Sequence, residues 1–448
     1  MLGLARSGVA AARALAGRGG QVIASDALRV GEQVREALLA AGAVVRDGED
    51  GLDLLNGIAT LVKSPGVPRE APLVAAALSR GITVIGELEL GWRFLAQHEF
   101  IALTGSNGKT TTVELNGHIH RVAGLPVTVA GNVGTALTSL PGTVDAGAVV
   151  VCEASSFQLE DTLAFAPDAA VLLNLQEDHL DRHGTFENYR SAKLAVFAHQ
   201  PPGTIAVVPA GLALEDADGE GERVTFGEAR PAATTAQGPS AARSADAPTP
   251  DLSHREGTLV WRGEPLIAAS EIRLRGPHNR ENAMAAAAVC LARGLDPAAV
   301  REALATFAGV PHRLEEVGTT GGVTYINDSK ATNVASAEVG IRSFAGGVHL
   351  IAGGSEKGSD FTPLALPVKE RCKAVYLIGE TAPRLRAALA STGLPIDDAG
   401  DLETAFAHAR LAAVDGDVVL LSPACASYDQ YGSYEERGDH FRRLVSIR

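Results

Sequence analysis

A glycine-rich segment, LTGSNGKTTT at residues 103–112, has the residue types that hold the phosphates of a nucleotide. It follows an apolar run and precedes a helical stretch, so backbone N–H groups at the start of the helix would face phosphate oxygens. Lys109 can reach the β and γ phosphates, and the Thr110 hydroxyl can ligate Mg²⁺. Because the glycines are closer together than in the common phosphate loop, a plain Gly/Asn turn with a solvated lysine is the alternative. The candidate phosphate-binding residues are Gly105, Ser106, Asn107, Gly108, Lys109, Thr110 and Thr111.

Acidic and histidine side chains follow two further apolar runs. VVVCEASSFQLE at 149–160 is typical of a buried strand ending in Glu153, whose carboxylate would supply a metal ligand beside the phosphate loop. A glutamate paired with a lysine at the sheet edge fits the pattern equally well. In LNLQEDHLDRHGTFENYRSAK at 173–193, His179 could bind a metal through a neutral imidazole, although the spacing fits no zinc site. A surface hydrogen-bonding role is the alternative for His179, and Lys193 by residue type alone is a solvated surface charge.

Two polar sets lie nearer the middle of the chain. GPHNREN at 276–282 opens an alanine-rich helix and offers Asn279 and Asn282. GVPHR at 309–313 places Arg313 at the junction with the last third of the chain, and an arginine suits bidentate contact with phosphate. Helix capping and linker chemistry explain either set about as well.

Polar residues also follow the strands expected in the last third of the chain. INDSKATN at 326–333, LIAGGSEKGSD at 350–360 and LSPACASYDQYGSYEERG at 421–438 each follow an apolar run. Because ligands gather at the carboxyl ends of parallel strands, these segments predict a pocket for a small carboxylate. Three unrelated solvated loops are the alternative. The candidates there are Asp328, Ser329, Lys330, Thr332, Lys357, Ser427, Tyr428 and Tyr434.

Strands and helices must position these segments, and the chain alternates the two throughout. We expect strands at 22–26, 61–62, 83–85, 100–103, 148–152, 170–174, 205–208, 323–327, 348–352, 374–378 and 417–421. We expect helices at 9–18, 33–41, 72–80 and 280–293. This alternation predicts an α/β protein with mostly parallel sheets. The length favours about three domains of roughly 150 residues, which we place at 1–92, 93–309 (with a flexible surface loop at 228–250) and 310–448.

The first of these units begins abruptly. Residues 3–8 form a glycine turn, and Asp26 ends the strand that follows the first helix. Such a turn normally follows a strand, and almost nothing precedes Gly3, so we interpret the unit as lacking its first strand and prefer a mis-assigned start codon as the explanation. A dinucleotide oxidoreductase would explain the turn and Asp26 but not residues 103–193. An ATP-driven switch would explain the phosphate loop but not the polar clusters of the last third.

The composition is that of a folded globular chain, with 448 residues of which 46% are hydrophobic and 21% charged. The chain has 39 basic and 53 acidic residues, and its net charge of −14 argues against a nucleic-acid partner. Four cysteines without close pairing indicate reduced thiols and a cytoplasmic location. Apolar runs stay shorter than the ~18 residues of a membrane span, and residues 1–20 lack a signal-peptide pattern, so no membrane partner is expected.

Taken together and in order, the motifs resemble those of the Mur ligase family over nearly the whole chain. The matching segments are GSNGKTT, GNVG at 131–134, SSFQLE, DHLDRH, GPHN, PHR, NDSKATN and LSPACASYDQY. The short phosphate loop is the family's normal form. NDSKATN and LSPACAS are the most specific segments, because family branches that add other amino acids differ there, and they point to the branch that adds D-glutamate.

The resemblance implies a three-domain, ATP-dependent carbon–nitrogen ligase of cytoplasmic peptidoglycan precursor synthesis. It would join D-glutamate to UDP-N-acetylmuramoyl-L-alanine through an acyl phosphate, as a monomer using ATP and two Mg²⁺ ions. The first, Rossmann-like domain would bind the UDP end, the central domain would bind ATP, and the third, Rossmann-like domain would bind D-glutamate and close over ATP. Another amino-acid ligase of the same family is the alternative.

The resemblance also implies roles for single residues. The catalytic residues would be Lys109, Glu153, His179 and Lys193, and the metal ligands would be Thr110, Glu153, His179 and Lys193 as a carbamate, a CO₂ adduct that turns a cation into an anion. Besides the phosphate loop, ATP would contact Asn279, Asn282, Arg313 and Asp328. The nucleotide-sugar substrate would contact Leu4, Ala5, Arg6, Asp26, Ser64, Gly66, Asn132 and Ser155. D-Glutamate would contact Lys330, Thr332, Lys357, Ser427, Tyr428 and Tyr434, of which Tyr434 matches only as an aromatic residue.

Overall fold

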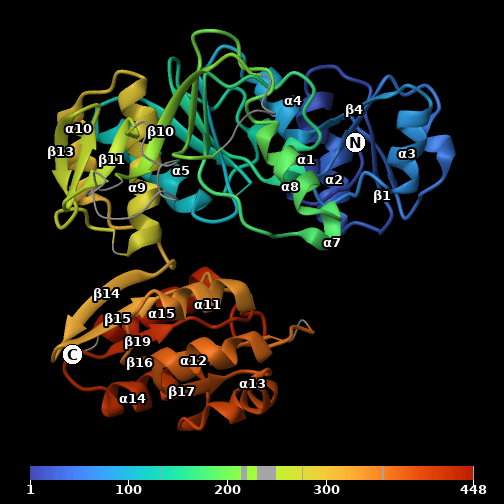
Figure 1. Cartoon of the computed structure of the whole chain (residues 1–448). Helices are drawn as coiled ribbons and strands as arrows, with labels where there is room; N and C mark the ends of the chain where they lie inside the picture. Colours follow the sequence, from blue (N-terminus) through green and yellow to red (C-terminus); the bar gives the residue numbers. More distant parts are fainter. Residues whose placement is uncertain (133, 213–218, 230–248, 275, 356–357, 447–448) are drawn as a thin grey trace, which may run out of the picture. The chain divides into compact units, whose positions relative to one another are not determined.

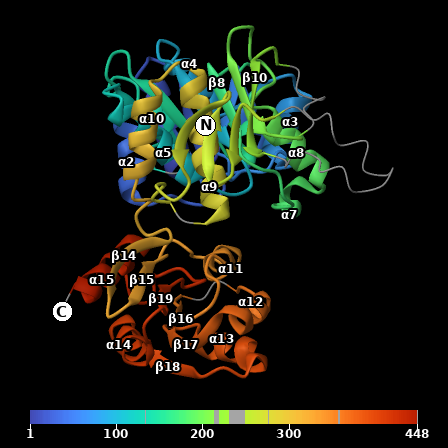
Figure 2. The same ribbon diagram turned by 60° about the vertical axis from the view of Figure 1, so that its left-hand side comes forward.

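The computed structural model describes residues 1–132, 134–212, 219–229, 249–274, 276–355 and 358–446. Its contacts divide the chain into two compact units, Met1–Phe307 and Ala308–Arg448, which are drawn in Figures 1 and 2. Unit 1 thus contains the residues expected for the first two domains except 308 and 309, and unit 2 contains those expected for the third. Lys357 and most of the loop predicted at 228–250 lie outside the described residues.

The first part of unit 1 contains two short parallel strand pairs joined by the start of the chain. β1 (Ile23–Asp26) pairs with β2 (Val44–Asp47), and β3 (Thr60–Lys63) pairs with β4 (Thr83–Gly86). Leu2 forms parallel bridges to Ser25 and Lys63, which places it between β1 and β3, where the sequence predicts a missing strand. The helices of this part are α1 (Arg6–Ala16), α2 (Glu32–Ala40), α3 (Pro72–Ser79) and α4 (Glu87–Phe94).

A nine-stranded sheet forms the rest of unit 1, in the order β13-β12-β11-β10-β9-β8-β5-β7-β6. The strands are β5 (Phe100–Thr104), β6 (Val127–Gly131), β7 (Val149–Glu153), β8 (Ala169–Leu172), β9 (Ile205–Pro209), β10 (Glu222–Glu228), β11 (Leu252–Arg255), β12 (Thr258–Trp261) and β13 (Glu264–Ala268). Neighbours from β6 to β11 are parallel, and β11, β12 and β13 pair antiparallel. The carboxyl ends of β5, β6, β7 and β8 therefore share one edge, where the predicted site residues begin.

Helices cover both faces of this sheet, because alternate residues of its buried strands point to opposite sides. On one face, Phe100 and Val150 pack with residues of α4 and α8 (Phe186–Leu194). On the other face lie α5 (Lys109–Val122) and α9 (Pro277–Ala292), with α10 (Pro297–Thr306) beside them. The buried alanines of α9 allow it to approach α5 closely. Shorter helices are α6 (Ser156–Leu159) and α7 (Leu180–His183).

Unit 2 is a six-stranded sheet in the order β14-β15-β19-β16-β17-β18, parallel except for the β14–β15 pair. Its strands are β14 (Glu315–Thr320), β15 (Val323–Asn327), β16 (Val348–Gly353), β17 (Cys372–Ile378), β18 (Ile396–Gly400) and β19 (Val418–Leu421). Leu350 packs in the cluster on the α11–α13 side, and its neighbour Ile351 packs in the cluster with α14 and α15. These helices are α11 (Val334–Arg342), α12 (Ala365–Arg371), α13 (Ala382–Leu389), α14 (Leu402–Ala412) and α15 (Tyr434–Ser446).

The α/β class, the mostly parallel sheets and every strand and helix predicted from the sequence are confirmed, with ends shifted by a few residues. The sequence analysis missed β2, β6, β14, β18 and the four strands β10–β13. None of the helices in the described ranges is long and apolar enough to cross a membrane.

Candidate active site

The phosphate-loop candidate lies where β5 ends at Thr104 and α5 begins at Lys109. Gly108 has a positive φ of 82°, and a Cβ there would lie 2.0 Å from Asn282 Oδ1. Glycine is therefore required at this position, because Asn282, in the second turn of α9, lies directly against the loop. Asn282 Nδ2 in turn donates to Asn279 Oδ1 at 3.3 Å, so the structure brings both predicted asparagines to the loop.

Lys109 lies over the loop that it follows. Its Nζ donates to the carbonyl oxygens of Gly105 at 2.8 Å and Ser106 at 2.9 Å. The loop is fixed from the other side by the segment after β8, because the backbone N–H of Asn107 donates to Asn174 Oδ1 at 2.9 Å. An ammonium group and a helix N-terminus thus face the same bend, which is the arrangement that binds phosphate.

Glu153 ends β7, the strand beside β5, and its carboxylate is almost fully buried. Thr110 Oγ1 donates to its Oε2 at 2.9 Å, and Asn132 Nδ2, from the end of β6, donates to its Oε1 at 3.0 Å. The structure therefore brings together three predicted residues whose carboxylate, hydroxyl and amide oxygens are hard donors that suit Mg²⁺. The described residues hold no cluster of three or more His, Cys, Asp or Glu side chains that could bind a metal alone.

Its residue type alone suggested that Lys193 is a solvated surface charge, and this interpretation is wrong. Lys193 is buried, with only 2% of its surface exposed. Its Nζ donates to Gly105 O at 2.8 Å and lies 4.7 Å from the centroid of the Tyr189 ring. Burial, followed by repulsion from Lys109, lowers the pKa of Lys193 to about 7. Near neutral pH, a large fraction of the molecules therefore has an uncharged Lys193 amine, and an uncharged amine is a nucleophile.

Tyr189 is a site residue that the sequence analysis did not identify. Its hydroxyl lies 2.8 Å from Ser106 Oγ, and its ring faces Lys193, so it links the phosphate loop to α8. Burial raises the pKa of Tyr189 to about 12, which keeps the hydroxyl protonated. Its position four residues before Lys193, on one face of a helix, is the signal that could have identified it.

His179 precedes α7 and has a positive φ of 52°. Its ring centroid lies 4.8 Å from that of Phe157 and 6.5 Å from that of Tyr189. The imidazole Nε2 is 3.5 Å from Asp178 Oδ2, and the side chain is 48% exposed. His179 is therefore accessible to a ligand while its ring packs on the group of residues that contacts the phosphate loop.

The residues predicted to bind the UDP end gather at the turn before α1. The backbone N–H of Leu4 donates to Asp26 Oδ2 at 2.7 Å. Ser7 Oγ lies 3.4 Å from Ser64 Oγ, which joins the same turn to the one after β3. Ala5 and Arg6 begin α1, and Gly66 is exposed in the turn after β3.

Ser155 has a structural role in the first turn of α6. Its hydroxyl accepts from the backbone N–H of Gln158 at 3.3 Å, and the Gln158 side chain accepts from the Ser155 backbone at 3.0 Å. This capping box fixes the turn that directly follows Glu153.

In unit 2, Asp328 follows β15 and is fully buried. Its Oδ2 accepts from Ser422 Oγ at 2.7 Å and its Oδ1 from the backbone N–H of Leu314 at 3.2 Å. Burial raises the pKa of Asp328 to about 7, and the nearby Arg313 opposes that rise. The structure thus brings these two predicted nucleotide residues close together.

Arg437, which the sequence analysis did not single out, connects the predicted amino-acid loops of unit 2. Its side chain is 1% exposed. It donates to Ser329 Oγ and to Ser329 O, both at 2.9 Å, and to Cys425 O at 3.1 Å. One guanidinium group therefore fixes the loops after β15 and β19 relative to each other.

The residues predicted to contact the amino acid differ in exposure. Ser427 is buried, Thr332 is half-buried and Tyr428 is exposed. Lys330 Nζ lies 5.9 Å from the centroid of the Tyr434 ring.

The raised pKa of Asp328 predicts how the stability of the protein depends on pH. The native state binds this proton more tightly than the unfolded state, so the contribution to stability is complete below about pH 4 and is lost as pH rises through about 7. At about 1.4 kcal/mol per pKa unit, the free energy of unfolding should fall by up to about 4 kcal/mol over that window. Denaturant titrations at several pH values measure the free energy of unfolding of the protein and of Asp328→Asn. The free energy of the protein, relative to that of Asp328→Asn, should fall as pH rises through this window. A difference that does not change with pH would contradict the assignment.

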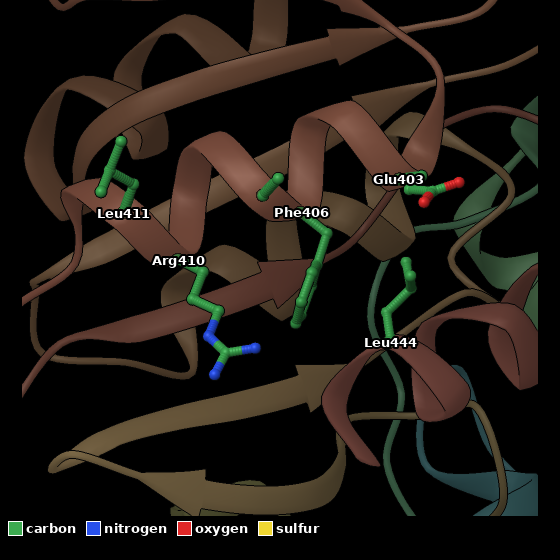
Figure 3. A pocket seen from close by; sticks show the side chains of 6 residues that line it. Glu403, Phe406, Arg410, Leu411 and Leu444 are labelled. Atoms are coloured by element: carbon green, nitrogen blue, oxygen red, sulfur yellow. The ribbon is translucent and has the colours of Figure 1, made fainter. Parts of the chain in front are cut away.

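A depression of about 480 Å³ lies on the surface of unit 2, away from the predicted residues. Figure 3 shows its lining by Phe406, Arg410 and Leu411 of α14 and by Leu444 of α15. The lining is mostly apolar and contains none of the residues that the sequence predicts for nucleotide or amino-acid binding. We therefore place the candidate active site at the strand ends and not in this depression.

Two family models match the chain. Residues 103–290 match the Mur ligase middle domain, and residues 312–425 match the Mur ligase, glutamate ligase domain. The chain is 41% identical to a UDP-N-acetylmuramoylalanine–D-glutamate ligase of Acidobacterium capsulatum, over 99% of this chain and 95% of the relative. It is 42% identical to the protein of the same name in Anaeromyxobacter dehalogenans, over 100% and 96%.

Solved structures show a similar fold at lower sequence identity. The UDP-N-acetylmuramate–alanine ligase of Thermotoga maritima superposes with a TM-score of 0.58 at 20% identity, covering 100% of this chain and 99% of the other. A pseudomurein peptide ligase type C of Methanothermus fervidus gives 0.56 at 17% identity, covering 99% and 98%.

Proposed function

Because the chain belongs to the Mur ligase family, we propose that it is the ligase that adds D-glutamate to UDP-N-acetylmuramoyl-L-alanine with consumption of ATP. The relatives that carry this name match nearly the whole chain at about 40% identity. In the structure, the proposal is supported by a group of polar side chains at the ends of β5, β6 and β7. Four side chains meet there around the bend proposed to bind phosphate, namely Lys109, Thr110, Asn132 and Glu153.

The substrate carboxylate is a poor acyl donor, because its oxygen is a poor leaving group. It must therefore be activated before an amine can displace that oxygen. We propose that its oxygen attacks the γ-phosphate of ATP, which forms an acyl phosphate and releases ADP. The backbone N–H groups after Gly105 and the ammonium group of Lys109 stabilise the charge on the transferring phosphoryl group. Such positioned donors are each typically worth a few kcal/mol in the transition state.

The amine of D-glutamate, as the free base, then attacks the acyl carbon. The tetrahedral intermediate collapses to the amide and inorganic phosphate, with loss of the amine proton. We propose that Lys330, Thr332, Ser427, Tyr428 and Tyr434 bind the amino acid, together with Lys357. The buried Arg437 supports this proposal, because it fixes the loops that carry most of these residues.

We propose that Thr110, Glu153, His179 and carbamylated Lys193 hold two Mg²⁺ ions, which neutralise phosphate charge when bound. The buried, near-neutral amine of Lys193 supports the carbamate, since a free amine adds CO₂ and loses one proton to give a carbamate anion. That anion would also replace the repulsion between Lys193 and Lys109 by attraction.

We further propose a cytoplasmic monomer. The four cysteines are free and buried, as expected in a reducing compartment. The net charge of −14 supports small molecules as its partners and disfavours nucleic acid.

Amide formation with a panel of amino acids tests the proposed function. The protein is incubated with ATP, Mg²⁺ and UDP-N-acetylmuramoyl-L-alanine, and D-glutamate is compared with L-glutamate, L-lysine and L-alanine. We expect a product mass corresponding to one added glutamyl residue with D-glutamate only, and phosphate release only when all substrates are present. A product with L-lysine would indicate another ligase of the family, and ATP hydrolysis without acceptor would indicate a switch.

A further inference from the structure

Arg182, in α7, connects two parts of unit 1 that lie far apart in the sequence. Its Nη2 donates to the carbonyl oxygens of Val67 at 3.1 Å and Pro65 at 3.4 Å, in the turn after β3. The same atom pairs with Glu160 Oε1 at 2.7 Å, and the Arg182 side chain is only 14% exposed. A charge-assisted contact of this kind, with little access to water, holds its partners more firmly than a surface ion pair does.

The guanidinium group of Arg182 also packs on an aromatic ring that His179 uses. The Arg182 Cζ lies 4.9 Å from the centroid of Phe157. The ring of His179 lies 4.8 Å from the same centroid. Arg182, Phe157 and His179 therefore form a continuous packed series that runs from the turn at 65–67 to the exposed imidazole.

The turn at 65–67 is held by a second buried cation, Lys63. Lys63 Nζ donates to Val67 O at 2.9 Å and forms ion pairs with Asp161 and, at 3.7 Å, with Glu160. Val67 O thus accepts from both Lys63 and Arg182, and the Glu160 carboxylate faces both cations. This shared set of acceptors couples the position of α7 to the position of the turn, because moving either cation away would leave a buried carboxylate without that partner.

We propose that Arg182 is a positioning residue that sets the distance between the two ends of the nucleotide-sugar site. This inference rests on the proposed function, in which the turn at Ser64–Gly66 contacts the UDP end of the substrate and His179 holds a Mg²⁺ ion at the reacting end. One substrate molecule must span both, so the reacting carboxylate reaches the phosphoryl group only if this distance is correct. Within the described part of the chain, Arg182 makes no hydrogen bond or ion pair to the phosphate loop, so it would affect ATP only through the position of the substrate.

Kinetics of Arg182→Ala and Arg182→Lys test this inference. We expect kcat/KM for the nucleotide sugar to fall on the order of 10- to 100-fold in Arg182→Ala, as for a misplaced substrate. The KM for ATP should stay within about twofold, since the phosphate loop is intact. Arg182→Lys keeps a cation for Glu160 but cannot cover the Phe157 ring as a planar group does, so its loss should be intermediate.

Two further measurements separate positioning from folding. Added guanidinium or methylguanidinium ion, at concentrations that leave the wild-type rate unchanged, should restore part of the Arg182→Ala activity. Arg69→Ala is the matched control, because Arg69 contacts the same segment but is 46% exposed: it donates to the backbone carbonyl oxygen of Glu160 at 3.1 Å and lies 3.8 Å from the Asp161 carboxylate. Arg69→Ala should keep near-wild-type kinetics and show no rescue.

The inference is overturned if Arg182→Ala matches wild type, if kcat/KM falls equally for ATP and the nucleotide sugar, or if activity is lost together with thermal stability and guanidinium restores none. These outcomes leave the proposed function intact, because the wild-type protein still forms the D-glutamyl product. A wild-type protein that forms no such product overturns both.

Discussion

Lys109→Ala is expected to lower the rate of amide formation by at least about a thousandfold, close to the limit of detection. Lys109 lies against the bend that would hold the transferring phosphoryl group, with its Nζ 2.8 Å from Gly105 O and 2.9 Å from Ser106 O. Removing a positioned cation from charge that builds up in the transition state costs several kcal/mol, and about 1.4 kcal/mol corresponds to tenfold in rate. Single-turnover formation of the amide, followed by mass spectrometry, measures the loss directly.

Lys373→Ala is the control for loss of a lysine. Lys373 pairs with Asp417 at 2.7 Å in unit 2 and is 51% exposed, so its removal should leave the rate nearly unchanged. Thermal unfolding of both variants checks that each is folded. Near-normal turnover by Lys109→Ala would remove the phosphate-binding role from this loop.

Lys193→Ala is expected to be nearly inactive and to regain activity with acetate or formate. The substitution removes the amine that would carry the carbamate and leaves a cavity beside the phosphate loop, where Lys193 Nζ now lies 2.8 Å from Gly105 O. A small carboxylate can enter that cavity and supply the missing negative charge. Acetamide has the same shape without the charge, so it should give no rescue at equal concentration.

A second measurement examines the adduct itself. Wild-type protein equilibrated with ¹³C-labelled bicarbonate should show a carbamate carbon signal that Lys193→Ala lacks. Inactivity without rescue by any small carboxylate, combined with the same signal in both proteins, would reject the carbamate at this position.

The sequence predicted the buried parallel strands well because their apolar runs are continuous. It missed β10–β13 because these strands lie toward the edge of the nine-stranded sheet and mix exposed with buried residues, as in the exposed start of β10 at Glu222. The phosphate loop and Glu153 could be predicted because the loop directly follows such a strand and Glu153 is the last residue of another.

Residues that act through tertiary contacts were harder to predict. Tyr189 and Arg437 become recognisable only when the structure places them against Ser106 and Ser329. Lys193 looked like a surface charge, since a helix in sequence does not reveal which face meets the phosphate loop. Arg182 lies in the same polar segment as His179, but its bond to Val67 joins residues 115 positions apart, which no local pattern indicates.

The transfer of oxygen from the acceptor substrate to phosphate tests the central claim most directly. UDP-N-acetylmuramoyl-L-alanine labelled with ¹⁸O in its alanyl carboxylate is converted with ATP and D-glutamate, and the released inorganic phosphate is analysed by mass. An acyl phosphate requires that one ¹⁸O atom pass to each phosphate released, because the carboxylate oxygen that attacks phosphorus leaves with it. Phosphate that carries no label from the carboxylate, while labelled amide accumulates, would contradict the mechanism.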